Sequence, residues 1–163
     1  MAILEIKKYN DSVLREKCQE VKEVDDEIRK IIDDMKETMK ENKGVGLAAP
    51  QVGIKKRIIV LDLDFIKQGE FELVNPKIIQ KSRETEIEEE GCLSFPNVFL
   101  KIRRSKNIVA EAQDRNGGKI RIEASGFLAR VLQHEIDHLD GILFFDRLPI
   151  LKRIKFKFST IRK

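Results

Sequence analysis

Both histidines of the chain stand in one short segment, residues 133–138, which reads QHEIDH. His134 and His138 are four positions apart, so on a helix they lie about 40° apart and share one face. Glu135 then lies beside that face. Two imidazoles at this spacing bind a metal ion, and the glutamate is placed to act as a general base on a water molecule. Two coincidental histidines on a surface helix are the alternative. The apolar residues on both sides of the segment argue against it, because a buried His or Glu without a partner is costly.

A hydrolytic metal site of this kind usually needs a third protein ligand. In some metalloproteases a third histidine follows downstream, and the chain matches their pattern as far as Gly141. The next required position is Phe144, however, which cannot bind a metal. Asp140 and Asp146 are the other downstream candidates, and both are poorly spaced. The third ligand is therefore expected upstream.

Cysteine is a strong candidate for that ligand, and the chain has two cysteines. Cys18 stands at an apolar spacing, which favours a small buried residue. Cys92 follows a glycine in EEEGCLSFP and is the favoured ligand. Two cysteines in a chain of this size do not form a disulfide framework, so reduced thiols and a cytoplasmic location are expected.

The composition is that of an ordinary globular protein, with 41% apolar and 37% charged residues among 163. This length suits one domain, residues 1–163. The sequence contains no apolar run of about 18 residues that could span a bilayer, and its first residues do not resemble a signal peptide. No membrane partner is expected.

Periodicity predicts helices and strands in an irregular order. Apolar residues at helical spacing predict a helix over 25–42, and a second over 126–139 that Ser125 could cap and Gly141 could end. The expected strands are 57–63 and 71–79, with a hairpin over 107–124 around Asn116-Gly117. Residues 44–53 read as a small-residue loop, and the acidic run 84–90 as a solvated strand edge, apart from Glu90. This order favours an α+β fold. Short antiparallel sheets would pack around a central metal-binding helix.

The last segment, residues 147–163, holds seven Lys and Arg and no acidic residue. A stripe at helical spacing predicts a C-terminal helix that packs through its apolar side, although IKFKF also alternates like a strand. The stripe consists of Leu148, Leu151, Ile154, Phe158 and Ile161. The purely structural interpretation is a packed helix with a solvated basic face. The functional interpretation adds contact between this face and ribosomal RNA.

Three motifs together resemble those of the peptide deformylases, in the same order: GVGLAAPQ at 44–51, EGCLS at 90–94 and QHEIDH at 133–138. The resemblance covers nearly the whole chain. It implies hydrolysis of the N-formyl group from the formyl-methionine of new polypeptides, with release of formate. It also implies that Cys92, His134 and His138 hold the metal. Glu135 would be the base, and the Gln51 amide and the Leu93 N–H would bind the oxyanion.

The resemblance further implies that Gly46, Glu90 and Leu93 contact the substrate. Candidates for the methionine pocket are Val45, Phe127 and Val131, all of which could equally be ordinary core residues. Sulfur with two imidazoles suits Fe(II), Zn(II), Co(II) or Ni(II), and the family association favours Fe(II). A buried Asp137 needs a partner; Arg104 is favoured over Arg103.

Two other functions are weighed against this one. A small endopeptidase would share the histidine motif but would lack the usual downstream ligand. A non-enzymatic metal-binding or ribosome-binding module would leave Glu135 and Gln51 without a role.

Overall fold

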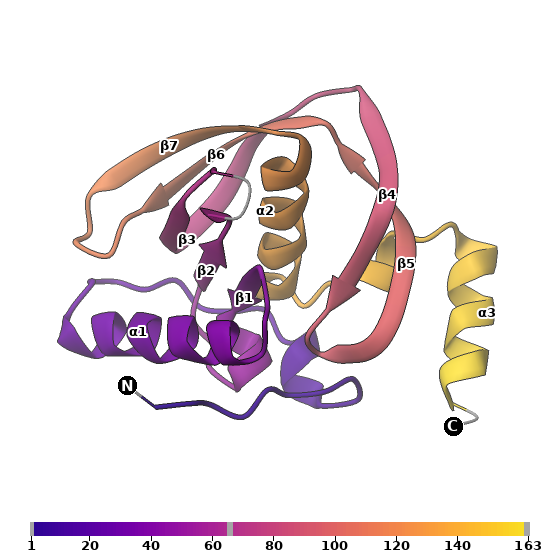
Figure 1. Ribbon diagram of the computed structural model, residues 1–163, viewed down its shortest axis with the longest axis horizontal. Coiled ribbons are helices and arrows are strands. Elements are labelled where there is room, and N and C mark those ends of the chain that lie inside the picture. The colour runs from indigo at the N-terminus through magenta and orange to yellow at the C-terminus, as the bar shows by residue number, and fades with distance from the viewer. Residues whose placement is uncertain (1, 65–66, 162–163) are drawn as a thin grey trace.

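The computed structural model describes residues 2–64 and 67–161, and side chains at the C-terminal end as far as 157. Its elements confirm the α+β prediction, with two antiparallel sheets and a helix between them (Figure 1). The larger sheet has the strand order β1-β2-β3-β6-β7. Its strands are β1 Gly46–Ala48, β2 Ile58–Asp62, β3 Glu70–Lys81, β6 Asn107–Gln113 and β7 Lys119–Ser125.

A second sheet is the hairpin of β4, Thr85–Cys92, and β5, Phe95–Ser105. The acidic run is therefore in a strand, as expected, whereas β5 was not predicted. Residues 44–53 are more ordered than the predicted loop. They contain β1 and a 3-10 helix, Ala49–Val52, which ends at Gly53 with a positive φ of 80°.

Helix α1, Asp26–Glu41, begins where the sequence predicts, because the Asp25 carboxylate accepts the Ile28 N–H at 2.9 Å. Its apolar stripe covers one face of the larger sheet. The buried contacts join Ile32 and Met35 to Ile58 and Val60 of β2. The neighbouring residues of β2 point to the opposite face, because side chains alternate along a strand.

Helix α2, Gly126–Leu139, covers that opposite face and lies in the middle of the molecule (Figure 1). Its Leu132 and Ile136 pack in one cluster with Ile59 and Leu61 of β2. The helix matches the predicted range, and Gly141 follows it with a φ of 70°, the predicted left-handed stop. Ser125 occupies the N-cap position, but its side chain makes no capping hydrogen bond, so that expectation was wrong.

Helix α3, Ile150–Ile161, confirms a C-terminal helix but packs through a different face from the one predicted. Leu151 is 78% exposed and Ile154 46%. Phe156 packs instead on Phe145, with ring centroids 5.1 Å apart, and Leu148 joins the same cluster. This aromatic contact sets the rotation of the helix and turns part of the predicted stripe toward solvent. Phe158 and Ile161, also in that stripe, lie outside the described side chains.

Candidate metal centre and substrate cleft

The structure brings together the three residues that the sequence proposes as metal ligands. His134 and His138 project from one face of α2, and Cys92 is the last residue of β4. Their ligand atoms all lie within 4.8 Å of one another, and Cys92 Sγ is 3.3 Å from His138 Nε2. Both histidines are buried. One sulfur and two imidazole nitrogens at such spacing form a suitable donor set for a divalent transition metal.

Cys18, the rejected candidate, lies elsewhere and is buried in the cluster between the larger sheet and α2. Burial raises the pKa of its thiol to about 11. A thiol of this kind is inert toward metals, which need the thiolate. The interpretation of Cys18 as a small core residue is confirmed.

His134 is oriented by Glu90, whose carboxylate Oε2 accepts the Nδ1–H at 2.9 Å. This bond leaves Nε2 of His134 as the free ligand atom. Burial acts to raise the pKa of Glu90, but hydrogen bonds from His134 and Arg104 outweigh it and hold that pKa well below its ordinary value. Glu90 is therefore an anion that supports a ligand, a role that the sequence did not predict for it.

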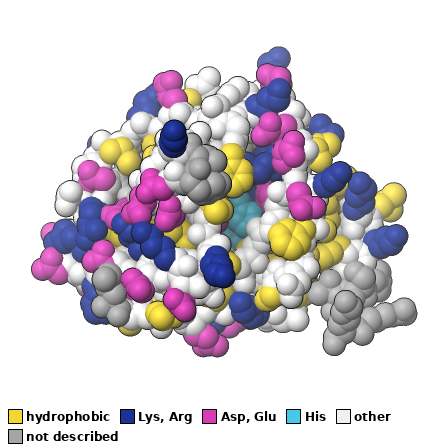
Figure 2. Space-filling model, in the orientation of Figure 1, with side chains coloured by type: hydrophobic (Ala, Val, Ile, Leu, Met, Phe, Trp, Pro, Cys, Tyr) yellow, Lys and Arg dark blue, Asp and Glu magenta, His cyan; other side chains and the backbone are white. Residues whose placement is uncertain are grey.

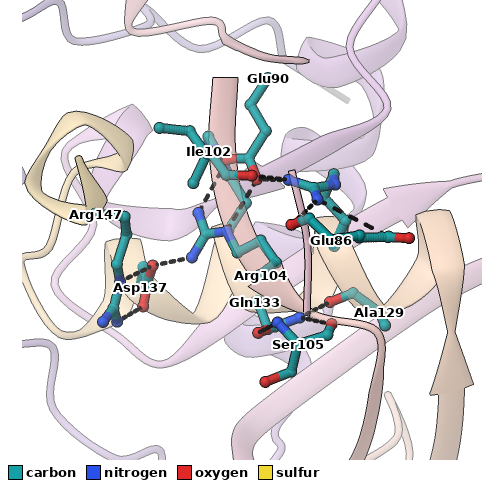
Figure 3. Close-up of polar contacts among 11 residues, drawn as sticks. Glu86, Glu90, Ile102, Arg104, Ser105, Ala129, Gln133, Asp137 and Arg147 are labelled. Atoms are coloured by element: carbon teal, nitrogen blue, oxygen red, sulfur yellow. Dashed lines mark hydrogen bonds and ion pairs between the residues drawn. The ribbon is translucent and has the colours of Figure 1, made fainter. Parts of the chain in front are cut away.

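Arg104 joins this carboxylate to α2 (Figure 3). It donates from Nε and Nη2 to the two oxygens of Glu90 at 2.9 and 3.0 Å, and from Nη1 to Asp137. The expected pairing of Asp137 with Arg104 is confirmed, whereas Arg103 donates to Thr85 Oγ1. A bidentate pair between buried groups fixes the hairpin against the helix.

Two further arginines, which the sequence analysis missed, complete the same network. Arg147 donates to both oxygens of Asp137, at 3.0 and 2.5 Å (Figure 3). Arg130 donates from Nη1 to Glu90 Oε1 at 2.7 Å and to the Ile102 carbonyl at 3.0 Å. A signal for Arg130 existed, because an arginine inside a helix that is expected to be buried requires an acidic partner, although the sequence does not indicate which one.

Glu135 lies beside the ligands and is buried, and burial raises its pKa to about 7. Its Oε2 has no hydrogen-bond partner within the described residues. A buried carboxyl group with a free oxygen and a pKa near neutrality has the properties of a general base.

Gln51 lies in the 3-10 helix, and its side chain faces the candidate metal ligands. Its Oε1 accepts the Ala48 N–H at 2.8 Å, which fixes the amide so that Nε2 points toward the ligands. Nε2 lies 3.2 Å from Ser94 Oγ and 3.5 Å from Cys92 Sγ. The amide is thus a prearranged hydrogen-bond donor, and Ser94, which the sequence analysis did not single out, helps to hold it.

A cleft of about 520 Å³ opens above these groups, and histidine is visible at the bottom of a hollow in Figure 2. A second cavity of about 100 Å³ adjoins the cleft. All three candidates for the methionine pocket, Val45, Phe127 and Val131, line this smaller cavity together with Glu90. Gly46 and Leu93 line the larger one.

Comparison with known proteins agrees with this geometry. Residues 3–154 match the model of the polypeptide deformylase family. The chain belongs to the peptide deformylase family. It is 49% identical to the peptide deformylase of Thermodesulfovibrio yellowstonii, over 98% of this chain and 99% of that one.

Solved peptide deformylase structures have the same fold. The enzyme of Ehrlichia chaffeensis in complex with actinonin superposes with a TM-score of 0.91 at 43% identity, over 99% of this chain and 97% of the other. The enzyme of Thermus thermophilus superposes with a TM-score of 0.92 at 41% identity, over 98% of this chain and 94% of the other. Peptide deformylases are metal-dependent hydrolases, and the Cys/His/His group supplies this chain with a place for the metal.

A testable consequence of the geometry concerns Gly46, whose backbone passes directly over the general-base candidate. A Cβ at position 46 would lie 2.5 Å from Oε1 of Glu135, too close for any real contact. Gly46→Ala should therefore displace this carboxylate and lower kcat for a formyl peptide by about 10²-fold, the typical effect of a misplacement near 1 Å.

The double variant Gly46→Ala/Glu135→Gln serves as the control. Because both changes act on one group, the double variant should be little slower than Glu135→Gln alone. Independent, additive losses would show that the alanine acts by another route.

Proposed function

We propose that the chain hydrolyses the N-formyl group of formyl-methionine at the start of new polypeptides and releases formate, with Cys92, His134 and His138 as ligands of one divalent metal ion. The observation that carries this proposal is the convergence of the three ligand atoms beside a buried carboxylate oxygen of Glu135 that has no hydrogen-bond partner among the described residues. We assign the reaction to one catalytic domain, residues 1–163, in the cytoplasm.

A metal ion held by these ligands would lower the pKa of a bound water and polarise the formyl carbonyl. Glu135 would accept the proton of the attacking water and pass it to the leaving amine. The Gln51 amide and the Leu93 N–H would donate hydrogen bonds to the carbonyl oxygen as negative charge develops on it. The fixed orientation of the Gln51 amide supports this role, because such donors act best when they need no rearrangement.

We favour Fe(II) as the metal. A thiolate and two neutral imidazoles leave a divalent site with one net positive charge, and these ligand types suit iron as well as Zn(II), Co(II) and Ni(II). The substrate would lie against Gly46, Glu90 and Leu93, with the methionine side chain in the small cavity between Val45, Phe127 and Val131.

The reaction is tested by measuring formate released from formyl-Met-Ala under anaerobic conditions, with and without a chelator. Parent enzyme loaded with Fe(II) should turn over, and the chelator should stop it. Glu135→Gln should keep the metal but lose at least about 10²-fold in rate, because an amide cannot accept the proton. Turnover by this variant near the parent rate would remove Glu135 from the mechanism.

The ligands are tested by metal content, independently of activity. Cys92→Ala removes the only sulfur in the ligand group, so the purified variant should hold far less metal than the parent protein. Cys18→Ala is the matched control and should bind metal normally, because Cys18 lies in the apolar core. Metal stoichiometry that followed Cys18 would contradict the assignment.

A second part of the proposal concerns the ribosome, through the basic residues of α3. Lys and Arg side chains gather where α3 adjoins the β4–β5 hairpin (Figure 2). A cavity of about 570 Å³ there is lined by Lys101, Arg103 and Lys152, and one of about 290 Å³ beside it by Lys101, Lys152 and Lys155. No acidic side chain of the described residues lines either cavity. Such a surface suits an RNA backbone.

Two basic side chains of α3 make contacts inside the chain, whereas Lys152 and Lys155 make no such contact within the described residues. Arg153 donates to the Asp146 carbonyl at 3.4 Å, and Lys157 lies over the Phe145 ring at 5.9 Å. Lys152→Ser/Lys155→Ser should therefore lower co-sedimentation with ribosomes at low salt while hydrolysis of a small formyl peptide stays unchanged. The charge-preserving pair Lys152→Arg/Lys155→Arg is the control. Equal sedimentation of all three proteins would leave α3 a purely structural helix.

A further inference from the structure

The cleft and the small cavity meet at a junction, from which a bound substrate can extend into both. Both are lined by Val45, Gly91, His134 and Glu135. Under the proposed function, on which this inference rests, the formyl group lies at this junction and the methionine side chain enters the smaller cavity. The peptide beyond the methionine then has to leave through the larger one.

Phe99 stands directly beyond that junction. It lies on β5, lines only the larger of these two cavities and is 63% exposed. Its ring lies against Gly91, where a Cβ would be 2.8 Å from the nearest ring carbon. The glycine therefore provides the space for the ring, and this contact holds an exposed aromatic side chain next to the residue that precedes Cys92.

The wall around Phe99 is mostly apolar. Pro96 and Val98 of the same strand also line the larger cavity, with the polar Asn97 between them in the sequence. Apart from Glu135 at the junction, the charged side chains that line this cavity within the described residues are those of Lys8 and Lys43. An apolar wall next to the reacting group favours a neighbouring apolar substrate side chain, because contact removes both from water.

We propose that Phe99 determines the preference for the residue that follows formyl-methionine, and that it favours a large apolar side chain, aromatic above all. The ring contacts the side chain of that residue on the cleft side of Gly91. Phe99 is a specificity-determining residue, since it takes no part in proton transfer or metal binding.

The experiment compares kcat/KM for formyl-Met-Phe, formyl-Met-Ala and formyl-Met-Asp peptides, all amidated at the C-terminus so that Lys8 and Lys43 meet no terminal carboxylate. The parent enzyme should prefer Phe over Ala by about three- to tenfold, the range expected for one aromatic contact. Phe99→Ala should abolish this preference through KM, with kcat for the Ala peptide retained, because the contact is made equally in the ground state and the transition state.

Phe99→Lys gives a result that a general loss of structure would not produce. Its ammonium group should reverse the order, so that the Asp peptide becomes a better substrate than the Phe peptide. Ile87→Ala is the matched control: Ile87 is an exposed apolar residue of the same hairpin that lies outside both cavities of the cleft, and it should leave the parent preference unchanged.

Two failures can be told apart. If the parent protein releases no formate from formyl-Met-Ala, the proposed function itself is wrong. If it does, but the Phe-to-Ala ratio is the same in parent and Phe99→Ala, or Phe99→Lys keeps the parent order, Phe99 does not select the substrate and the inference is overturned.

Discussion

The arrangement of the metal centre depends on a buried arginine. Arg104 has an acidic partner on each side, Glu90 from β4 and Asp137 from α2. Removing one partner of a buried ion pair typically costs about 3–5 kcal/mol, because it leaves an uncompensated charge. The hairpin and the helix are therefore held at the one separation that satisfies all three groups. Since Cys92 follows Glu90 by two residues and His138 follows Asp137 by one, this separation also places the proposed metal ligands.

The same constraint explains why a helix with so many polar residues can lie in the middle of the molecule. The apolar side of α2, including Leu132 and Ile136, meets the larger sheet. Its polar side meets the hairpin, which supplies hydrogen-bond partners for several of its buried polar groups. Gln133, for example, donates to the Ser105 carbonyl and accepts the Ser105 N–H. The two sheets thus have different tasks: the larger sheet packs on the apolar side of the helix, and the hairpin pairs with its polar side and completes the candidate site.

The elements recognised from the sequence are those whose pattern is local. Helices α1 and α2 and the hairpin over 107–124 have regular apolar periods and clear end signals, and the structure confirms them. Strand β5 was missed because its charged residues, among them Arg103 and Arg104, interrupt the regular apolar alternation that indicates a strand. The packing of α3 was wrong for a related reason: the contact between Phe145 and Phe156 competes with the stripe, and no local pattern indicates which will win.

The candidate site, too, could be predicted where its signal is local in the sequence and not where it depends on distant partners. The three motifs identify the residue types of the metal centre, because chemistry restricts those types. Arg130 and Arg147 could not be assigned to it. Each pairs with an acidic residue that is distant in the sequence, about 40 residues away for Arg130 and about 10 for Arg147. Phe99 could not be assigned either, but for a different reason. It is exposed, and neither packing nor charge balance requires an aromatic ring there. The buried network thus fixes where the proposed reaction takes place. The outer part of the hairpin is not held by this network, so its side chains can change and select different substrates. Substrate preference can then change without disturbing the proposed ligands, because the exposed ring lies against Gly91 and outside the buried network of charges.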